Sequence, residues 1–186
     1  ALLTRIRQAP AVRHASPRVY AVGLLSTGNR SAGGELVGVD PVHEGALNRL
    51  FTPDLAAALS AGHTIALGER LALDIGAQIG DEVAVIAPAA DGTQGNELFR
   101  VAAIIHAGLP AVDRTLAMLR IDDAQALLSL APERIHEIAV AVGDPMDAET
   151  VSPDIQQLVG TTAGATVLGW RELLPQLSNY VDFAGA

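Results

Sequence analysis

Helix-like and strand-like patterns of apolar residues alternate along this chain. At the N-terminus, apolar positions 2, 3, 6 and 9 recur at helical spacing and predict a short amphipathic helix over residues 1–8, ending before Pro10. Two apolar segments follow, which predict strands over residues 17–25 and 35–39. The polar, glycine-containing stretch between these strands predicts a loop over residues 26–34.

The middle of the chain predicts short helices and then a β-rich segment. Helices are expected over residues 46–50 and 53–60, and Thr52 is the expected N-cap of the second because Pro53 follows at its first position. The β-rich segment is expected to contain a strand over 64–67, a helix over 69–75, a turn over 79–82, and strands over 83–87 and 98–106. The loop that joins the last two strands, residues 88–97, carries Asp91-Gly92, a hairpin-turn signal.

The last third returns to alternating strands and helices. The predicted strands cover residues 115–121, 135–142 and 166–169, and the predicted helices cover residues 122–130, the apolar face at 151–159, and 171–181. Asp122 and Gln125, three residues apart, predict a capping box. Because both ends of the chain have a β-α-β character, we expect an α+β fold in which residues 1–61 and 113–186 form one subdomain and residues 62–112 are inserted.

Composition narrows the classes of function. The 186 residues are 49% apolar but only 3% aromatic, which suffices for one core built from small aliphatic side chains, or for two small subdomains that share one. The chain has no cysteine, so a thiol catalyst and a zinc-thiolate site are excluded. All twelve basic residues are arginine, which excludes a P-loop lysine and Schiff-base chemistry. The net charge of −9 repels nucleic acid and anionic lipid headgroups on average.

The polar residues form no catalytic or metal-binding motif. Asp40, His43 and Glu44 do not have a recognised metal-ligand spacing, and Ser26 lies outside any Gly-x-Ser-x-Gly elbow. The glycine-containing stretch 28–34 lacks the order of a phosphate-binding loop. We therefore expect no cofactor, no metal and no catalysis. The alternative, an acidic hydrolase, would require carboxylates and a histidine that converge in a pocket, and the sequence spacing gives no sign of them.

A few other residues have a structural and a functional interpretation. Gly38, Gly68 and Gly80 are expected to permit positive φ angles in turns rather than to contact a ligand. Trp170, with the leucines that follow it, is expected to form a core-facing helix stripe rather than a groove for a partner.

Several short sequence motifs, taken in order, resemble those of a known family. They are Gly-Val-Asp-Pro at 38–41, Leu-Gly-Glu-Arg-Leu-Ala at 67–72 and Gly-Asp-Glu-Val at 80–83, followed by the segments 99–104, 119–125 and 170–172. Their order and spacing resemble the extracytoplasmic, or periplasmic core, domain of the MacB/LolC/LolE/FtsX-like permeases of ABC transporters. The likeness extends from about residue 16 to residue 176.

The resemblance implies a fold and a set of partners. It implies a discontinuous porter-like subdomain, 1–61 with 113–186, and an inserted, mostly β, sabre-like subdomain, 62–112. It implies a position on the extracytoplasmic face of a bacterial membrane, between membrane helices that this segment lacks, so we interpret the chain as a domain excised from a longer protein. The implied partners are a second permease subunit, identical or not, a cytoplasmic ATPase and a periplasmic protein, but no nucleic acid.

The resemblance also implies a non-enzymatic function. ATP-driven motion of the flanking membrane helices would be coupled to the handling or export of a lipoprotein, a peptide or a small molecule. The alternative is an FtsX-like regulatory scaffold that binds and activates a partner such as a cell-wall hydrolase. The chain has no long aromatic-bearing loop like the hook with which LolC recruits a chaperone, so recruitment of that type is not expected.

The two predicted polar loops are the expected contacts with partners or cargo, because loop tips can vary while a packed scaffold fixes their ends. The candidate residues are Ser26, Asn29 and Arg30 in the first loop and Asp91, Gln94 and Asn96 in the second.

Overall fold

The computed structural model describes residues 2–160 and 164–173. The chain divides into two compact units, which we call the terminal unit, Ala1–Ala15 with Val140–Ala186, and the central unit, Ser16–Ala139. This division does not coincide with the boundaries expected near residues 62 and 112. The porter-like and sabre-like assignment therefore stays a prediction.

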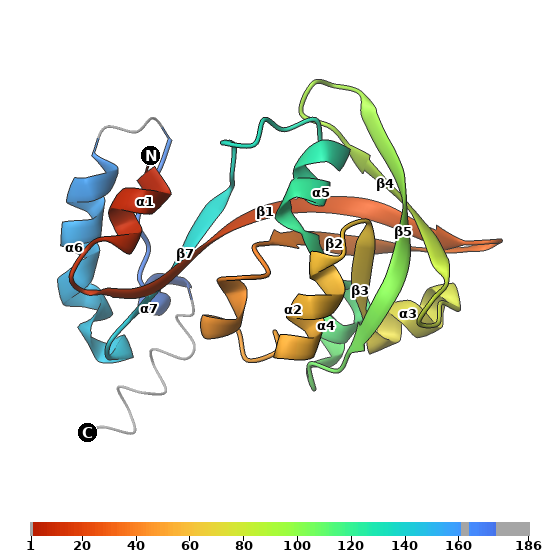
Figure 1. Ribbon diagram of the computed structural model, residues 1–186, viewed down its shortest axis with the longest axis horizontal. Coiled ribbons are helices and arrows are strands. Elements are labelled where there is room, and N and C mark those ends of the chain that lie inside the picture. Colours follow the sequence, from red (N-terminus) through yellow and green to blue (C-terminus); the bar gives the residue numbers. More distant parts are fainter. Residues whose placement is uncertain (1, 161–163, 174–186) are drawn as a thin grey trace. The chain divides into compact units, whose positions relative to one another are not determined.

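The helices and strands follow one another in a mixed order (Figure 1). The strands are β1 (Val12–Thr27), β2 (Arg30–Val39), β3 (Thr64–Gly68), β4 (Glu82–Pro88), β5 (Gln94–Ile105), β6 (Leu116–Arg120) and β7 (Glu137–Val142). The α-helices are α1 (Leu2–Arg7), α2 (Pro53–Ser60), α3 (Glu69–Ile75), α4 (Pro110–Thr115), α5 (Ile121–Leu127), α6 (Ala148–Val159) and α7 (Trp170–Leu173). Short 3₁₀ turns are η1 (Glu44–Ala46) and η2 (Pro145–Asp147).

In the central unit, six strands close into a barrel. The sheet order is β2-β6-β3-β5-β4-β1-β7, and β1 pairs with β2 as well as with β4, so the first strand of this order meets the sixth. The β2–β6 and β3–β5 pairs are parallel, whereas the pairs β1–β2, β1–β4, β4–β5 and β3–β6 are antiparallel. Closure pairs the strand edges with one another, so the central unit needs no second sheet to cover them.

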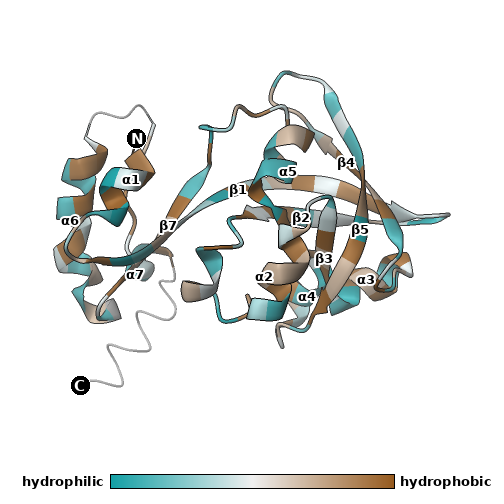
Figure 2. Cartoon of the chain, in the orientation of Figure 1, coloured by the Kyte–Doolittle hydropathy of each residue, from teal (hydrophilic) through white to brown (hydrophobic). Residues whose placement is uncertain are grey.

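The barrel interior is the main hydrophobic core. Alternate residues of the strands point inward, among them Leu25, Leu67 and Phe99, and each is almost fully buried. Helix α3 adds Leu71 and Ile75 to the same core. Figure 2 shows the apolar residues concentrated along β3 and β5.

A second, smaller core lies outside the barrel wall. Helix α2 places Leu55 and Leu59 against outward-facing residues of β2, β3 and β6 such as Ala66. The predicted cap of this helix is confirmed, because the Thr52 hydroxyl accepts a hydrogen bond from the Leu55 amide at 3.3 Å.

Two of the three glycines singled out from the sequence serve close packing rather than turns. Of Gly38, Gly68 and Gly80, only Gly80 has a positive φ, +97°. A Cβ on Gly38 would lie 2.6 Å from the Cβ of Ala124 in α5, and a Cβ on Gly68 would overlap the backbone of Asp113. The prediction of positive φ was therefore wrong for Gly38 and Gly68, where helices press directly on strands.

The predicted loop over residues 26–34 is wrong, because the strands continue through it. Thr27 pairs with Arg30, and only Gly28 and Asn29 form the turn of the β1–β2 hairpin. Residues 26–34 are mostly small and polar, a composition typical of a loop. Their main-chain hydrogen bonds to the facing strand nevertheless hold most of them in β1 and β2. The second predicted loop is shorter than expected for the same reason, since β5 begins at Gln94.

Some helices and strands predicted for the last third of the chain were also wrong. Helix α5 begins at Ile121 with Arg120 at its N-cap, and no side chain caps it, so the predicted capping box does not form. Gln125 instead donates to the carbonyl oxygens of Pro132 and Arg134, both at 2.9 Å. Helix α4 was not predicted, and the predicted strand over 166–169 does not form. Helix α7 is described only as Trp170–Leu173, and residues 174–181 of the predicted last helix lie outside the described part.

The core assignment makes a direct prediction about α3. Leu71→Ala should lower the free energy of unfolding by about 2–5 kcal/mol, because Leu71 is fully buried and its loss leaves a cavity. Urea denaturation measures this change. The matched control is Leu73→Ala on the same helix, where Leu73 is 60% exposed and the change should stay within about 0.5 kcal/mol. Equal effects of the two substitutions would contradict the assignment.

Candidate functional site

The structure separates the two groups of residues expected to contact partners. Ser26 lies opposite Ala84, near the start of β4, whereas the β4–β5 hairpin turn follows the end of β4 at Pro88. The tips of the two hairpins therefore lie at opposite ends of the barrel. Ser26 and Arg30 lie in strands and Asn29 in the first turn, while Asp91 lies in the second turn and Gln94 and Asn96 lie in β5. A contact of all six residues with partners or cargo stays a prediction.

Two of these residues have local structural partners. Arg30 donates from Nη2 to the carbonyl oxygen of Leu73 at 3.0 Å, which ties the first hairpin to α3. Asp91 accepts hydrogen bonds at Oδ1 from the Thr93 hydroxyl at 2.6 Å and the Thr93 amide at 3.0 Å. The Thr93 hydroxyl, followed by the Thr93 amide, lowers the pKa of Asp91 below its usual value, because both bonds favour the charged carboxylate.

The structure shows a surface that the sequence analysis missed, on the outer face of β1. Val22 and Leu24 point outward from this strand and are 72% and 45% exposed. The pairing between β1 and β4 covers only Leu24–Ser26 of β1, with Leu24 opposite Ile86. Continuing that register would place Pro88 opposite Val22, but proline has no amide proton to donate and β4 ends there.

Two hollows adjoin at this point, and both are lined by Val22 and Pro88. The first, about 560 Å³, lies over Leu24 and Ile86, with Gly92, Thr93 and Gln94 on one side. The second, about 330 Å³, extends to Tyr20 and His136. Its floor includes Leu128 and Leu130, which follow α5. We call the two together the β1 groove.

A buried ion pair fixes the end of the β1 groove. Arg18, on the same face of β1, binds the carboxylate of Glu44 through two nitrogens at 2.7 and 3.2 Å. Its third nitrogen reaches Glu137 at 3.2 Å. Glu44 is fully buried, whereas Glu137 is 44% exposed.

The same network holds the groove-lining residues Tyr20 and His136. The Tyr20 hydroxyl donates to Glu137 at 3.1 Å, and the Tyr20 amide donates to Nδ1 of His136 at 2.8 Å. His136 in turn donates its own amide to the carbonyl oxygen of Arg18 at 3.0 Å. These contacts join β1 to the start of β7 within the central unit.

The network shifts the pKa of two of its members. Burial opposes the charge of Arg18, but hydrogen bonds to Glu44 and Tyr20 outweigh it and raise the pKa of Arg18 above its usual value. Burial also raises the pKa of Tyr20, although the nearby Arg18 opposes that shift. Arg18 therefore stays charged and Tyr20 stays neutral at physiological pH.

The described residues contain no group of three or more histidine, aspartate or glutamate side chains placed to hold a metal ion. Among Asp40, His43 and Glu44, the first two form a hydrogen bond of 2.6 Å between Nδ1 of His43 and Oδ2 of Asp40. The Glu44 carboxylate instead accepts a hydrogen bond from Arg18. None of the described helices is both long enough and apolar enough to cross a membrane.

Comparison with known proteins decides the family. The family model for the MacB-like periplasmic core domain matches residues 1–158. The chain belongs to this family. Among curated proteins, it is 27% identical over 156 residues to the lipoprotein-releasing system transmembrane protein LolC of Neisseria meningitidis serogroup B, covering 77% of this chain and 37% of LolC. The chain thus spans little more than a third of that relative.

Solved structures of low sequence identity share the fold. The extracellular domain of YknZ, a noncanonic ABC-type transporter from Gram-positive bacteria, has a TM-score of 0.66 at 10% identity, covering 90% of this chain and 87% of its own. The periplasmic region of MacB from Actinobacillus actinomycetemcomitans has a TM-score of 0.64 at 16% identity, covering 96% and 81%. A permease domain from Porphyromonas gingivalis has a TM-score of 0.54 at 13% identity, covering 85% and 67%.

The resemblance expected from the sequence is thereby confirmed. The MacB-like core is the extracytoplasmic domain of an ABC transporter permease, and its mixed helix-and-strand fold agrees with the expected α+β class at that level.

The buried ion pair makes a prediction about stability. Glu44→Ala should lower the free energy of unfolding by about 3–5 kcal/mol, because it leaves the Arg18 guanidinium largely buried without its main partner. Glu137→Ala is the matched control, since this second partner of Arg18 is half-exposed and should contribute no more than about 1 kcal/mol. Urea denaturation at constant pH compares them. A loss below about 1 kcal/mol for Glu44→Ala would contradict the role of the pair.

Proposed function

We propose that this domain couples ATP-driven motion of flanking membrane helices to the handling or export of a substrate on the extracytoplasmic side of the membrane. The observation that carries the proposal is the terminal unit, in which the first 15 residues and the segment from Val140 onward form one compact body. Movement of the membrane helices would then enter the domain through a single unit. The substrate classes are those expected from the sequence: a lipoprotein, a peptide or a small molecule.

The proposed partners follow from the same role. A second permease subunit, identical or different, would face this domain, and a cytoplasmic ATPase would drive both. The chain itself would supply no chemistry, which is supported by its lack of lysine and cysteine and by its membership of a family of permease domains.

A regulatory scaffold is the second candidate function, and the β1 groove favours it. An exposed apolar surface is typical of a site that binds another protein. In this role the domain would hold and activate an extracytoplasmic enzyme such as a cell-wall hydrolase, and no substrate would cross the membrane.

Spin labels test the coupling. The chain has no cysteine, so Asn29→Cys at the tip of the first hairpin provides one attachment site per domain within this segment. In the complete, paired transporter, the distance distribution between the two labels should change when ATP is bound and return after hydrolysis. Pulsed electron paramagnetic resonance measures it, and an ATPase-inactive transporter is the control. An identical distribution in all nucleotide states would contradict the coupling.

Transport assays separate the two candidate functions. ATP-dependent movement of cargo by the reconstituted transporter supports export, whereas activation of a wall hydrolase without cargo movement supports the scaffold.

The isolated chain should bind neither nucleotide nor metal. We expect its melting temperature to be unchanged by ATP with magnesium and by a chelator, because a ligand bound only to the native state would raise it. Differential scanning fluorimetry measures this, with a known ATPase as the positive control. A reproducible shift of several degrees would show that a binding site has been overlooked.

A further inference from the structure

The segment that leads into β7 is tied to β1 by a hydrogen bond that requires an unprotonated ring nitrogen. The Tyr20 amide donates to Nδ1 of His136 at 2.8 Å. A ring nitrogen accepts a main-chain hydrogen bond only through its lone pair, so Nδ1 carries no proton in this arrangement. The neutral imidazole therefore holds its proton on Nε2. A second proton on the ring would go to Nδ1, place two donors against each other and break the bond to Tyr20.

Among the side chains of this network, His136 is of the type that changes charge near neutral pH. Histidine ordinarily titrates between pH 5 and 8. Arg18 stays charged and Tyr20 stays neutral over this range, because the pKa of each is raised. The bond between Tyr20 and His136 needs the neutral imidazole, so it is present at the upper end of the range and is lost as the pH falls.

The network beside His136 can accommodate the added proton. Arg18 carries one positive charge, and the two carboxylates that it binds, Glu44 and Glu137, carry two negative charges. One positive and two negative charges leave an excess of one negative charge, which a proton on His136 would neutralise. Glu137 follows His136 in the sequence, so it is the carboxylate toward which a protonated ring would turn.

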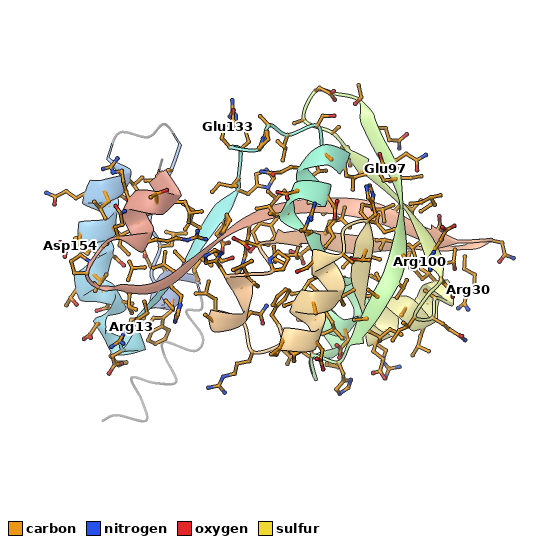
Figure 3. The ribbon with its side chains drawn as sticks, in the orientation of Figure 1. Arg13, Arg30, Glu97, Arg100, Glu133 and Asp154 are labelled. Atoms are coloured by element: carbon orange, nitrogen blue, oxygen red, sulfur yellow. The ribbon has the colours of Figure 1, made fainter. Side chains whose placement is uncertain are left out.

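The other charges around His136 are few. The second hollow, which His136 lines, brings in the β4–β5 hairpin, where Asp91 follows the lining residues, and the segment after α5, which lines the hollow only with leucines. In the segment of His136 itself, Glu133 and Arg134 carry opposite charges, and Figure 3 shows the Glu133 side chain pointing away from β1. Arg18 and its two carboxylate partners therefore dominate the electrostatics of His136.

The bond also lies close to one of the two points where the chain passes between the units. The central unit ends at Ala139, shortly after His136, and the terminal unit resumes at Val140. Within the central unit, the remaining printed bonds from β7 to β1 side chains are those of Glu137 to Arg18 and to Tyr20. A protonated His136 that turned toward Glu137 would compete for this carboxylate, so the loss of one bond would weaken the others.

We propose that His136 is a pH-sensitive tie, whose protonation opens the bond to the Tyr20 amide and loosens the start of β7 from β1. Acidification on the extracytoplasmic side would then weaken the connection through which movement of the terminal unit enters the barrel. The opening of the tie is a property of this chain alone, whereas its effect on transport rests on the proposed function.

Hydrogen exchange of the Tyr20 amide tests the tie on the 186-residue chain. We expect its protection factor, corrected for the intrinsic effect of pH on exchange, to be about fivefold lower at about pH 5 than at about pH 7.5. The internal control is the Ala90 amide, which donates to the carbonyl oxygen of Leu128 at 2.8 Å, an acceptor that does not titrate. Equal protection of the Tyr20 amide at the two pH values would overturn the proposal.

Two variants of His136 separate the acceptor from the charge. His136→Asn keeps an acceptor at the position of Nδ1 but cannot be protonated, so protection of the Tyr20 amide should agree within about twofold at the two pH values. His136→Phe keeps a ring without an acceptor, so protection should be low at both. The same pH dependence in His136→Asn as in the original chain would assign the effect to another group and overturn the proposal.

A measurement on the unchanged chain decides the question if a variant fails to fold. The nitrogen resonances of the His136 ring report its protonation and its tautomer. We expect the neutral ring to carry its proton on Nε2, and the Tyr20 amide proton to shift with the same midpoint as the ring. A neutral ring protonated on Nδ1, or an amide that shifts independently of the ring, would overturn the proposal.

The complete transporter separates failure of this inference from failure of the proposed function. The ATP-driven change in distance between labels at Asn29→Cys should be smaller at about pH 5 than at about pH 7.5, and His136→Asn should remove this difference. Label movement that is equal at both pH values overturns the effect of the tie on transport and leaves the coupling intact. Absence of label movement at either pH overturns the coupling, whatever the exchange of the Tyr20 amide shows in the isolated chain.

Discussion

The central unit depends on closure of its barrel by β1. This strand pairs with β2 along ten positions and with β4 along three, so it closes the ring between these two strands. Two glycines allow helices to pack directly on the strands of the closed ring. A Cβ on Gly38 would overlap Ala124 of α5, and a Cβ on Gly68 would overlap the backbone of Asp113 in α4. Once the ring is closed, small aliphatic side chains fill it, which explains how a chain with so few aromatics forms a well-buried core.

The ion pair between Arg18 and Glu44 extends this constraint to the outer face of β1. A buried carboxylate is tolerated only when its partners replace water, and Arg18 supplies two donors at the geometry that suits a carboxylate. Because the third nitrogen of Arg18 and the Tyr20 hydroxyl both bind Glu137, the start of β7 is held against β1. The groove therefore ends at a network with a fixed geometry and is not bounded there by a loop.

The sequence predicted the elements that depend on local interactions and missed those that depend on distant ones. Thr52, Pro53 and the apolar spacing of α2 and α3 are local signals, so both helices were predicted with correct bounds. The sequence predicts a loop around Gly28 and Asn29, whereas the structure has a hairpin, because its small polar residues are held in strands by pairing with the facing strand. Arg18 is separated from Glu44 by 26 positions and from Glu137 by 119, and no periodicity connects residues so far apart. One signal for the groove is visible in the sequence: Tyr20, Val22 and Leu24 give β1 a second apolar face beside the one that points into the barrel.

Pro88 marks the place where the closed barrel leaves apolar surface exposed. Closed barrels protect a protein from unwanted strand addition because they pair their edges. Pro88 has no amide proton, so the β4 ladder ends beside Val22, and on the other side of Val22 the Tyr20 amide donates to Nδ1 of His136. The backbone of β1 is therefore bounded on both sides of Val22, whereas the side chains of Val22 and Leu24 stay exposed beside the two hollows. Because the barrel strands fix these side chains, the β1 groove is an apolar surface with a defined shape, which is typical of a site that binds another molecule.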